Sequence, residues 1–296
     1  MLILTLVACG DISNELFAED ALFLAAFPEE ERTEVDPDES ASSDRRADDS
    51  PLLFQMVVST ATTVNSTIKG ILTIVDTVRT YPPSARTEDG RSWGPWAMED
   101  ADGVDLSVWM NRTGQTRYDW GFDGNDTTFL SGTHYAGETV ATGDGAFVWD
   151  QTQLSEWSGE DFKGVFEVDY DNRDGVDVIM HGADVQSGDD ERAYLDYAWK
   201  RAADEGDFQF RTPVDLEDGS GELADMELRA RWIVGQGGRA DAVVSGGAYG
   251  DLVLHWSQCW NVSHTLVYQW DDLGITQPVG DAGDCPYTDF AYLDRI

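Results

Sequence analysis

Apolar and polar residues alternate in one segment after another between Val104 and Trp270, and this pattern constrains the fold more than any other feature. Because the side chains of a strand point alternately to the two faces of a sheet, each segment has one apolar and one polar face. The apolar sets include Val104, Leu106, Val108 and Met110; Tyr118, Trp120 and Phe122; Phe166, Val168 and Tyr170; Leu195, Tyr197 and Trp199; and Leu266, Tyr268 and Trp270. The sequence therefore predicts a mainly β protein with a large antiparallel sheet, dry on one face and wet on the other.

Asp-Gly pairs at residues 102–103, 123–124 and 144–145 indicate hairpin turns that recur every 21 residues. This spacing accommodates two strands and two turns per step, so the whole pattern predicts a meander of about twelve strands. A twisted sheet of that size seldom stays flat, and we expect it to curve into a half-open or closed barrel.

A single long segment, residues 51–79, has the period of a helix rather than of a strand. Its apolar residues recur every three or four positions and so share one helical face. They are Leu53, Val57, Ala61, Val64, Ile68, Ile71, Val75 and Val78. Ser50 is expected to cap this helix, Pro51 to occupy its first turn and Pro82 to end it. Many β-branched residues lower its intrinsic helix propensity, so packing on the sheet must stabilise it. A buried pair of strands is the alternative.

The chain carries 19 basic and 57 acidic residues, which gives a net charge of −38. So acidic a surface argues against nucleic acid as a partner, because phosphates require basic side chains, and against charge-driven adhesion to anionic lipids. Acid-rich, lysine-poor surfaces are typical of proteins that work at high salt, where ions screen the repulsion between carboxylates. Specific cation binding is the alternative explanation for this composition.

The chain begins with a short apolar segment, residues 1–8, followed by Cys9. The run Leu6-Val7-Ala8-Cys9 resembles the lipobox of bacterial lipoproteins, in which the chain is cut before a cysteine that receives lipid. The resemblance implies that residues 1–8 are a truncated signal peptide, since they lack a basic start and a longer apolar stretch. It also implies that Cys9 anchors the protein to a bacterial membrane, the outer membrane being the first expectation, facing the periplasm or the cell surface. A chance apolar N-terminus with an incidental cysteine is the alternative.

Residues 9–50 are predicted to form a lipidated acidic tether in front of a folded domain, residues 51–296. A short helix is expected over residues 14–27 of this tether. Residues 29–49 are almost entirely acidic residues, Ser, Pro and Arg, so they have little to bury. We expect them to be a disordered spacer between membrane and domain.

Two further cysteines, Cys259 and Cys285, remain if Cys9 carries lipid. An even pair in an exported chain predicts a disulfide bond between them. Two free thiols are the alternative. No third or fourth ligand lies at the spacing of a zinc site, so the cysteines do not predict a metal centre.

No motif of a known catalytic or nucleotide-binding site is recognisable in the chain. Its four histidines lie on different predicted strands. Residues 169–175 resemble a calcium loop only loosely, because Arg173 stands at a ligand position, and a hairpin turn is the better interpretation. With so many carboxylates, none can be identified as a glycosidase pair from sequence. We therefore expect a protein that is not an enzyme and has no cofactor or metal.

One curved sheet with one long amphipathic helix, over residues 51–271, resembles the half-barrel of outer-membrane lipoprotein carriers. The resemblance implies a lipid-like apolar ligand between sheet and helix. The helix residues that would line such a cavity are Val57, Val64, Ile68 and Ile71.

A filled core with a glycan-binding or protein-binding surface, or a purely structural role, is the second hypothesis. Trp109 belongs to the polar face, because it alternates with Asp105 and Ser107, while Trp93 and Trp96 lie near an edge of the sheet. Exposed aromatic rings stack on sugars or anchor partner proteins. A hydrolase is the third hypothesis, and it requires two carboxyl groups that converge in a cleft, one with a perturbed pKa.

Overall fold

The computed structural model describes residues 14–29, 50–97, 103–158, 162–187, 190–202, 204–215, 222–288 and 296. The predicted signal peptide and Cys9 lie outside the described residues, as does most of the acidic spacer. Among the described helices, none combines the length and the apolar character that crossing a bilayer would require.

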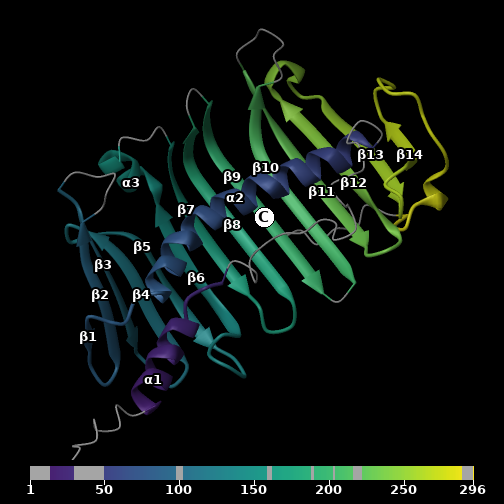
Figure 1. Cartoon of the computed structure of the whole chain (residues 1–296). Helices are drawn as coiled ribbons and strands as arrows, with labels where there is room; N and C mark the ends of the chain where they lie inside the picture. Colours follow the sequence, from purple (N-terminus) through teal and green to yellow (C-terminus); the bar gives the residue numbers. More distant parts are fainter. Residues whose placement is uncertain are drawn as a thin grey trace, which may run out of the picture.

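All strands belong to one antiparallel sheet in which each strand pairs with the next in sequence (Figure 1). The strands are β1 (Ala85–Arg86), β2 (Gly90–Ala97), β3 (Asp105–Arg112), β4 (Arg117–Gly124), β5 (Thr127–Ala136), β6 (Gly143–Asp150), β7 (Phe162–Asp171), β8 (Val176–Ser187), β9 (Asp190–Ala202), β10 (Glu205–Asp215), β11 (Leu223–Ile233), β12 (Gly237–Gly246), β13 (Val253–Asn261) and β14 (Leu266–Asp271). In the part of the chain that the structure describes, β1 and β14 are separate edges, so the sheet is open. The predicted meander is confirmed, with more strands than expected and without closing.

The turns fall only partly where the Asp-Gly pairs predict them. Asn125 and Asp126, directly after the second pair, join β4 to β5 with positive φ values of 46° and 67°, as a tight hairpin requires. The prediction of a turn at residues 144–145 is wrong, because both lie within β6. Gly145 occurs in a strand because Tyr170 covers it: a Cβ there would lie 2.6 Å from the Tyr170 hydroxyl oxygen.

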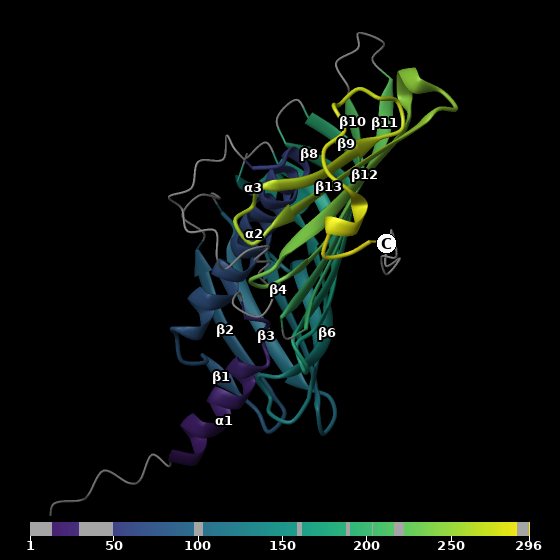
Figure 2. The ribbon, with the colours of Figure 1, turned by 90° about the vertical axis from the view of Figure 1, so that its right-hand side faces the viewer.

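One long helix, α2 (Leu52–Arg79), crosses the sheet from β13 to β2 (Figure 1). We call the face that it covers the inner face, and the opposite one the outer face. At about 1.5 Å per residue the helix is about 42 Å long, whereas the path from β2 to β13 along the sheet is about 53 Å at about 4.8 Å per strand. The sheet therefore curves around a straight helix, and Figure 2 shows this curvature from the side.

Contacts from distant strands fix both ends of α2. The backbone N–H of Leu53 donates to Gln258 Oε1 on β13 (2.7 Å), and after the helix Trp93 Nε1 on β2 donates to the Tyr81 carbonyl (3.1 Å). The predicted Ser50 cap is wrong, because the N-cap residue is Pro51, which has no side-chain cap. Gln258 supplies the missing acceptor from a position 205 residues away.

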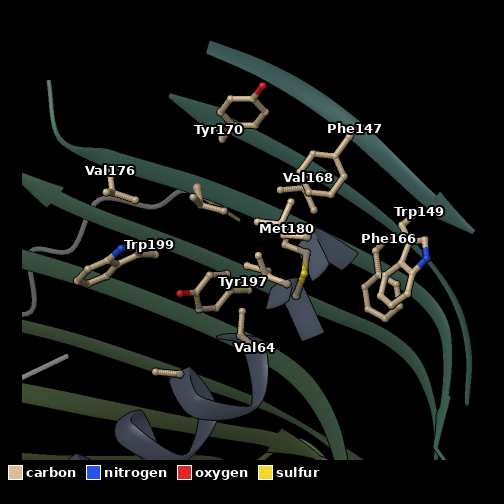
Figure 3. Packing of buried hydrophobic residues seen from close by; sticks show 14 of the residues in the cluster. Val64, Phe147, Trp149, Phe166, Val168, Tyr170, Val176, Met180, Tyr197 and Trp199 are labelled. Carbon is tan, nitrogen blue, oxygen red and sulfur yellow. The ribbon is translucent and has the colours of Figure 1, made fainter. Parts of the chain in front are cut away.

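The core lies between α2 and the inner face, and its side chains change in size across the sheet. The middle strands contribute large aromatic rings, including Trp149, Phe166, Tyr197 and Trp199 (Figure 3). Inward positions of β12 are small, with Ala240 and Ala242. The α2 backbone lies closest to β12, where these small side chains leave room for it, and then to β13 and β11.

A second helix, α1 (Asn14–Ala25), covers the inner face at the β2–β4 end. Phe23 and Phe27 are buried, and Phe27 packs against Trp120 and Phe122 with ring centroids 5.6 and 5.9 Å apart. The helix ends at Ala25, two residues earlier than predicted. This part of the predicted tether therefore belongs to the folded domain.

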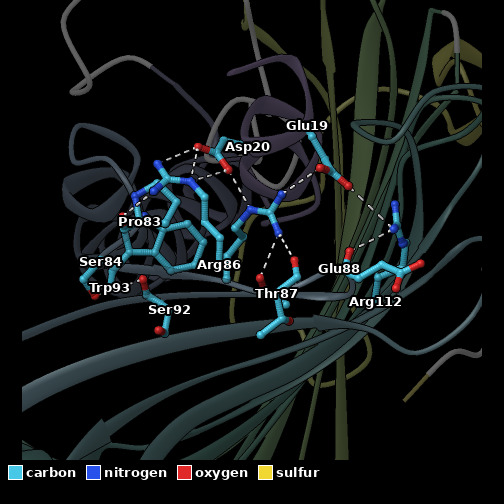
Figure 4. A network of polar contacts seen from close by, with 12 residues as sticks. Glu19, Asp20, Pro83, Ser84, Arg86, Thr87, Glu88, Ser92, Trp93 and Arg112 are labelled. Atoms are coloured by element: carbon cyan, nitrogen blue, oxygen red, sulfur yellow. Dashed lines mark hydrogen bonds and ion pairs between the residues drawn. The ribbon is translucent and has the colours of Figure 1, made fainter. Parts of the chain in front are cut away.

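Salt bridges attach α1 to the first strands (Figure 4). Asp20 accepts hydrogen bonds from Arg91 Nε (2.6 Å) and Arg86 Nη2 (2.9 Å), and Glu19 pairs with Arg91 Nη2 (3.1 Å) and Arg112 Nη2 (3.7 Å). The carboxylate of Asp20 and the guanidinium of Arg91 are both buried. The basic residues that α1 needs are therefore supplied by β1, β2 and β3.

The C-terminal segment is tied to the far end of the sheet by a disulfide bond between Cys259 and Cys285, as predicted. Beside this bond, Arg239 pairs with Asp241 (3.0 Å) and donates to the Tyr287 carbonyl (3.3 Å), while the Arg231 guanidinium lies 4.4 Å from the Tyr287 ring centroid. The segment thus covers part of the outer face.

Candidate ligand-binding surfaces

The helix residues predicted to line a cavity are packed against the sheet. Val57, Val64 and Ile68 have exposed fractions of 0%, 2% and 1%. A void wide enough for a water molecule would leave accessible area on them, so their side chains face a filled core. The side chain of Ile71 lies outside what the structure describes, and Leu72, one residue later, completes the buried stripe.

The same core contains buried polar atoms that have no hydrogen-bond partner among the described residues. They are Trp120 Nε1, Trp149 Nε1, Trp199 Nε1, Trp256 Nε1 and Tyr197 Oη. Tyr197 and Trp199 lie two residues apart on β9 and face α2, close to Val64 (Figure 3). Burial raises the pKa of Tyr197 well above its usual value, because the phenolate would be desolvated. Native proteins pair nearly all buried hydrogen-bond donors. The unpaired indole Nε1 and Tyr197 Oη atoms therefore mark positions where a ligand atom that accepts a hydrogen bond would be stabilised.

A neighbouring buried pair shows the usual arrangement. His134 Nε2 lies 2.7 Å from the Val140 carbonyl oxygen, so it must carry the proton and donate. His134 Nδ1 lies 2.9 Å from the Tyr170 hydroxyl oxygen, so both ring nitrogens have a hydrogen-bond partner. The sequence pattern placed Trp120, Tyr170, Tyr197 and Trp199 on the apolar face but gave no sign of which polar atoms would be paired.

Trp109 lies on the outer face, as predicted, and is half-buried. Its indole covers Gly121 on β4, where a Cβ would lie 2.6 Å from the ring. The glycine therefore lets the ring rest on the backbone of β4, and the strand pairing places Ser131 on the far side of Gly121. Trp109 is therefore a pre-positioned aromatic surface on the outer face.

Ordered polar groups lie beside Trp109. Asp119, two residues from Gly121 on the same face, accepts hydrogen bonds from Thr133 (2.8 Å), Thr113 (2.8 Å) and Arg117 (2.9 Å). Burial raises the pKa of Asp119, but the hydrogen bonds from Thr133, Thr113 and Arg117 outweigh it and hold the pKa below its usual range. A fixed, ionised carboxylate therefore stands next to the indole ring.

The other two predicted surface tryptophans point inward. Trp93 is 1% exposed, so its predicted role as an exposed binding residue is wrong. Trp96 is half-buried and packs on Tyr81, with ring centroids 5.5 Å apart. A bulge in β2 between Trp93 and Trp96 shifts the register, and their partners on β3, Val108 and Leu106, share the inner face. Simple alternation could not reveal this added residue.

Among the described residues, the carboxylates whose pKa is shifted are not arranged as a catalytic pair. Burial raises the pKa of Asp207, on the outer face, to about 6, and the charged groups that oppose this rise are Arg231, Arg229 and Lys200. Asp171, the last residue of β7, is engaged by Arg173, with Arg173 Nη2 2.5 Å from Asp171 Oδ2. Within the described ranges, no group of three or more His, Cys, Asp or Glu side chains is arranged to hold a metal ion.

Comparisons with protein-family models, with curated proteins and with solved structures find no match to this chain.

Proposed function

We propose that the protein is a lipid-anchored, non-enzymatic component of a bacterial cell envelope that binds a glycan on its outer face at Trp109. The observation that carries this proposal is the half-buried indole of Trp109, resting on Gly121 beside the ordered Asp119 carboxylate. The filled inner face supports it, because the predicted cavity residues are buried against the sheet. The anchoring rests on the lipobox resemblance of Leu6 to Cys9.

The chemistry around Trp109 matches what a sugar offers. A sugar ring presents C–H groups on its faces, which pack on an indole, and hydroxyl groups at its rim, which require fixed acceptors and donors. Asp119 supplies an acceptor, and Ser131 and the Nη groups of Arg117 supply donors on the same face. Because the ring is already positioned by the sheet, binding orders few side chains and costs little conformational entropy.

We expect Trp109→Ala to weaken glycan binding roughly tenfold, because the stacking surface is removed. Thermal unfolding should change little, since the ring is only half-buried. A microarray of bacterial envelope glycans would identify a ligand, and isothermal titration would measure the loss. Trp270→Ala is the matched control, because Trp270 is 39% exposed and lies at the other end of the sheet. Equal weakening by both variants, or no glycan bound by the wild type, would contradict the proposal.

A second candidate function is transport of an apolar ligand that carries acceptor groups, such as an acyl ester, beneath α2. The unpaired donors Tyr197 Oη and Trp199 Nε1 favour it. Leaving a buried donor unpaired costs about 1–3 kcal/mol, so a ligand that supplied acceptors while α2 moved outward would be stabilised there. The many β-branched residues of α2 are consistent with a helix that depends on its contacts.

Tyr197→Phe separates the two candidates. If the hydroxyl is unpaired in solution, the variant should be as stable as the wild type or up to about 2 kcal/mol more stable. Tyr170→Phe is the control and should lose about 1 kcal/mol, because it breaks the bond to His134. Denaturant unfolding measures both, and native mass spectrometry with solvent extraction shows any bound lipid. A co-purifying lipid that is lost in Tyr197→Phe would favour the carrier function.

A further inference from the structure

Two acidic residues of helix α1, Glu19 and Asp20, pair with arginines of the sheet, while the exposed side chains described on the helix are apolar. Asp20 is buried against Arg86 and Arg91, and Glu19 reaches Arg91 and Arg112. On the solvent side, all exposed side chains described between Leu16 and Ala25 are apolar; they are Leu16, Phe17, Ala18, Ala21 and Leu22. Phe17 is 59% and Leu22 is 44% exposed. We call these five residues the α1 outer face, which is a surface of the helix and not part of the outer face of the sheet.

An uncharged face of this kind is unusual on a chain with a net charge of −38. Water-exposed Phe and Leu side chains carry a free-energy cost that burial against apolar material would remove. Contiguous apolar positions on a surface mark sites of contact with a protein or a membrane. The position of α1 in the chain decides between them.

Only four residues separate Cys9 from Asn14, where α1 begins. At no more than about 3.6 Å per residue, α1 begins within about 18 Å of a lipidated Cys9. Because α1 is docked on the sheet, this limit applies to the whole domain rather than to a flexible arm. The predicted long spacer therefore does not separate the anchor from the fold, since residues 30–49 come after α1.

We propose that the α1 outer face lies on the lipid bilayer and orients the domain with its β1–β4 end toward the membrane. This inference rests on the lipid anchor of the proposed function. A bilayer interface accepts Phe and Leu side chains of a helix that lies parallel to it. Neutral lipid is the expected surface, because an acidic protein is repelled by anionic headgroups. The strand β3, which carries Trp109, then lies at the end of the sheet next to the membrane.

The test uses the full chain with Cys9→Ser, so that no lipid is attached, and phosphatidylcholine vesicles in high salt. Adding Phe17→Ser and Leu22→Ser should lower the fraction that floats with the vesicles roughly tenfold. The matched control adds Leu252→Ser and Val262→Ser, which are 60% and 51% exposed at the opposite end of the sheet. This control should change flotation less than about twofold. Residues 1–8 are present in every variant, so their apolar character cancels.

Equal flotation of both double variants would overturn the proposed membrane face. Mass spectrometry of Cys9 in the wild-type protein from a bacterial host tests the anchor independently. A lipidated Cys9 with no dependence on Phe17 and Leu22 would leave the anchor intact and refute the membrane face. An unmodified Cys9 together with flotation that requires Phe17 and Leu22 would refute the anchor and support the membrane face. Circular dichroism of each variant confirms that the exposed substitutions leave the fold unchanged.

Discussion

Replacing Asp20 with alanine is expected to destabilise the protein by about 3 kcal/mol and to release α1 from the sheet. The variant leaves the guanidinium of Arg91, whose side chain is 1% exposed, without its main partner. Removing one member of a buried ion pair costs about 3–5 kcal/mol, because the remaining charge is desolvated. Glu19 still reaches Arg91 Nη2 at 3.1 Å, so we expect the lower end of that range.

The pH dependence of Asp20 gives a second readout. Burial raises its pKa, but hydrogen bonds and charge from Arg86 and Arg91 outweigh that effect and lower it. Because the pKa of Asp20 is lower in the folded protein, its carboxylate stabilises the protein fully above the unfolded pKa of 3.8. This stabilisation is lost as the pH falls through the pKa of Asp20 in the folded protein. The wild type should therefore lose stability in acid, and Asp20→Ala should lack that part of the loss.

Denaturant unfolding at pH 7 and limited proteolysis before residue 50 measure the effect of Asp20→Ala. Asp171→Ala is the control, because its partner Arg173 is 52% exposed and exposed pairs contribute at most about 1 kcal/mol. A loss below about 1 kcal/mol for Asp20→Ala would show that the buried pair does not hold α1 in place.

Removing the disulfide by Cys259→Ser and Cys285→Ser is expected to destabilise the protein by about 3.5 kcal/mol. The two cysteines are 26 residues apart, and the loop-entropy model gives this value for a loop of that length. The local consequence is loss of the C-terminal segment from the outer face, where Tyr287 packs on Arg231. Glycan binding at Trp109 should persist in whatever fraction remains folded, since Trp109 lies at the other end of the sheet.

Alkylation of the unfolded, non-reduced wild type checks the bond directly. Cys259 and Cys285 should resist alkylation until a reductant is added, and reductant should lower the denaturation midpoint of the wild type but not that of the double variant. Full alkylation without reductant would mean that both thiols are free, which was the alternative for this pair. If the single variant Cys259→Ser is less stable than the single variant Cys285→Ser, the difference measures the free-energy cost of burying a serine at position 259. That position is 0% exposed in the folded chain.

The alternating pattern determined which residues face the core. Its prediction holds from β3 to β13, because a strand with one buried face must place every second side chain there. It is wrong for β14, where Tyr268 and Trp270 pair with Cys259 and Ser257 on the outer face. Periodicity also predicted the start of α2 to within one residue, because a 3.6-residue period can be recognised within the segment itself. Trp109 was placed on the outer face for the same reason. The cysteine count and the expected oxidising compartment were enough to predict the disulfide.

Only the tertiary structure decided the contacts that join distant parts of the chain. The β2 bulge turns both Trp93 and Trp96 inward, Gln258 caps a helix that begins 205 residues earlier, and Arg91 draws Asp20 and α1 onto the sheet. None of these is encoded in a local period, because each depends on strand register and on curvature accumulated over many strands. The sequence alone determined the faces of the strands and of the long helix, since burial acts on each segment separately. The folded sheet decided which of those faces became filled core, which stayed exposed, and how close to the domain the predicted anchor would lie, since these depend on groups that meet only in three dimensions.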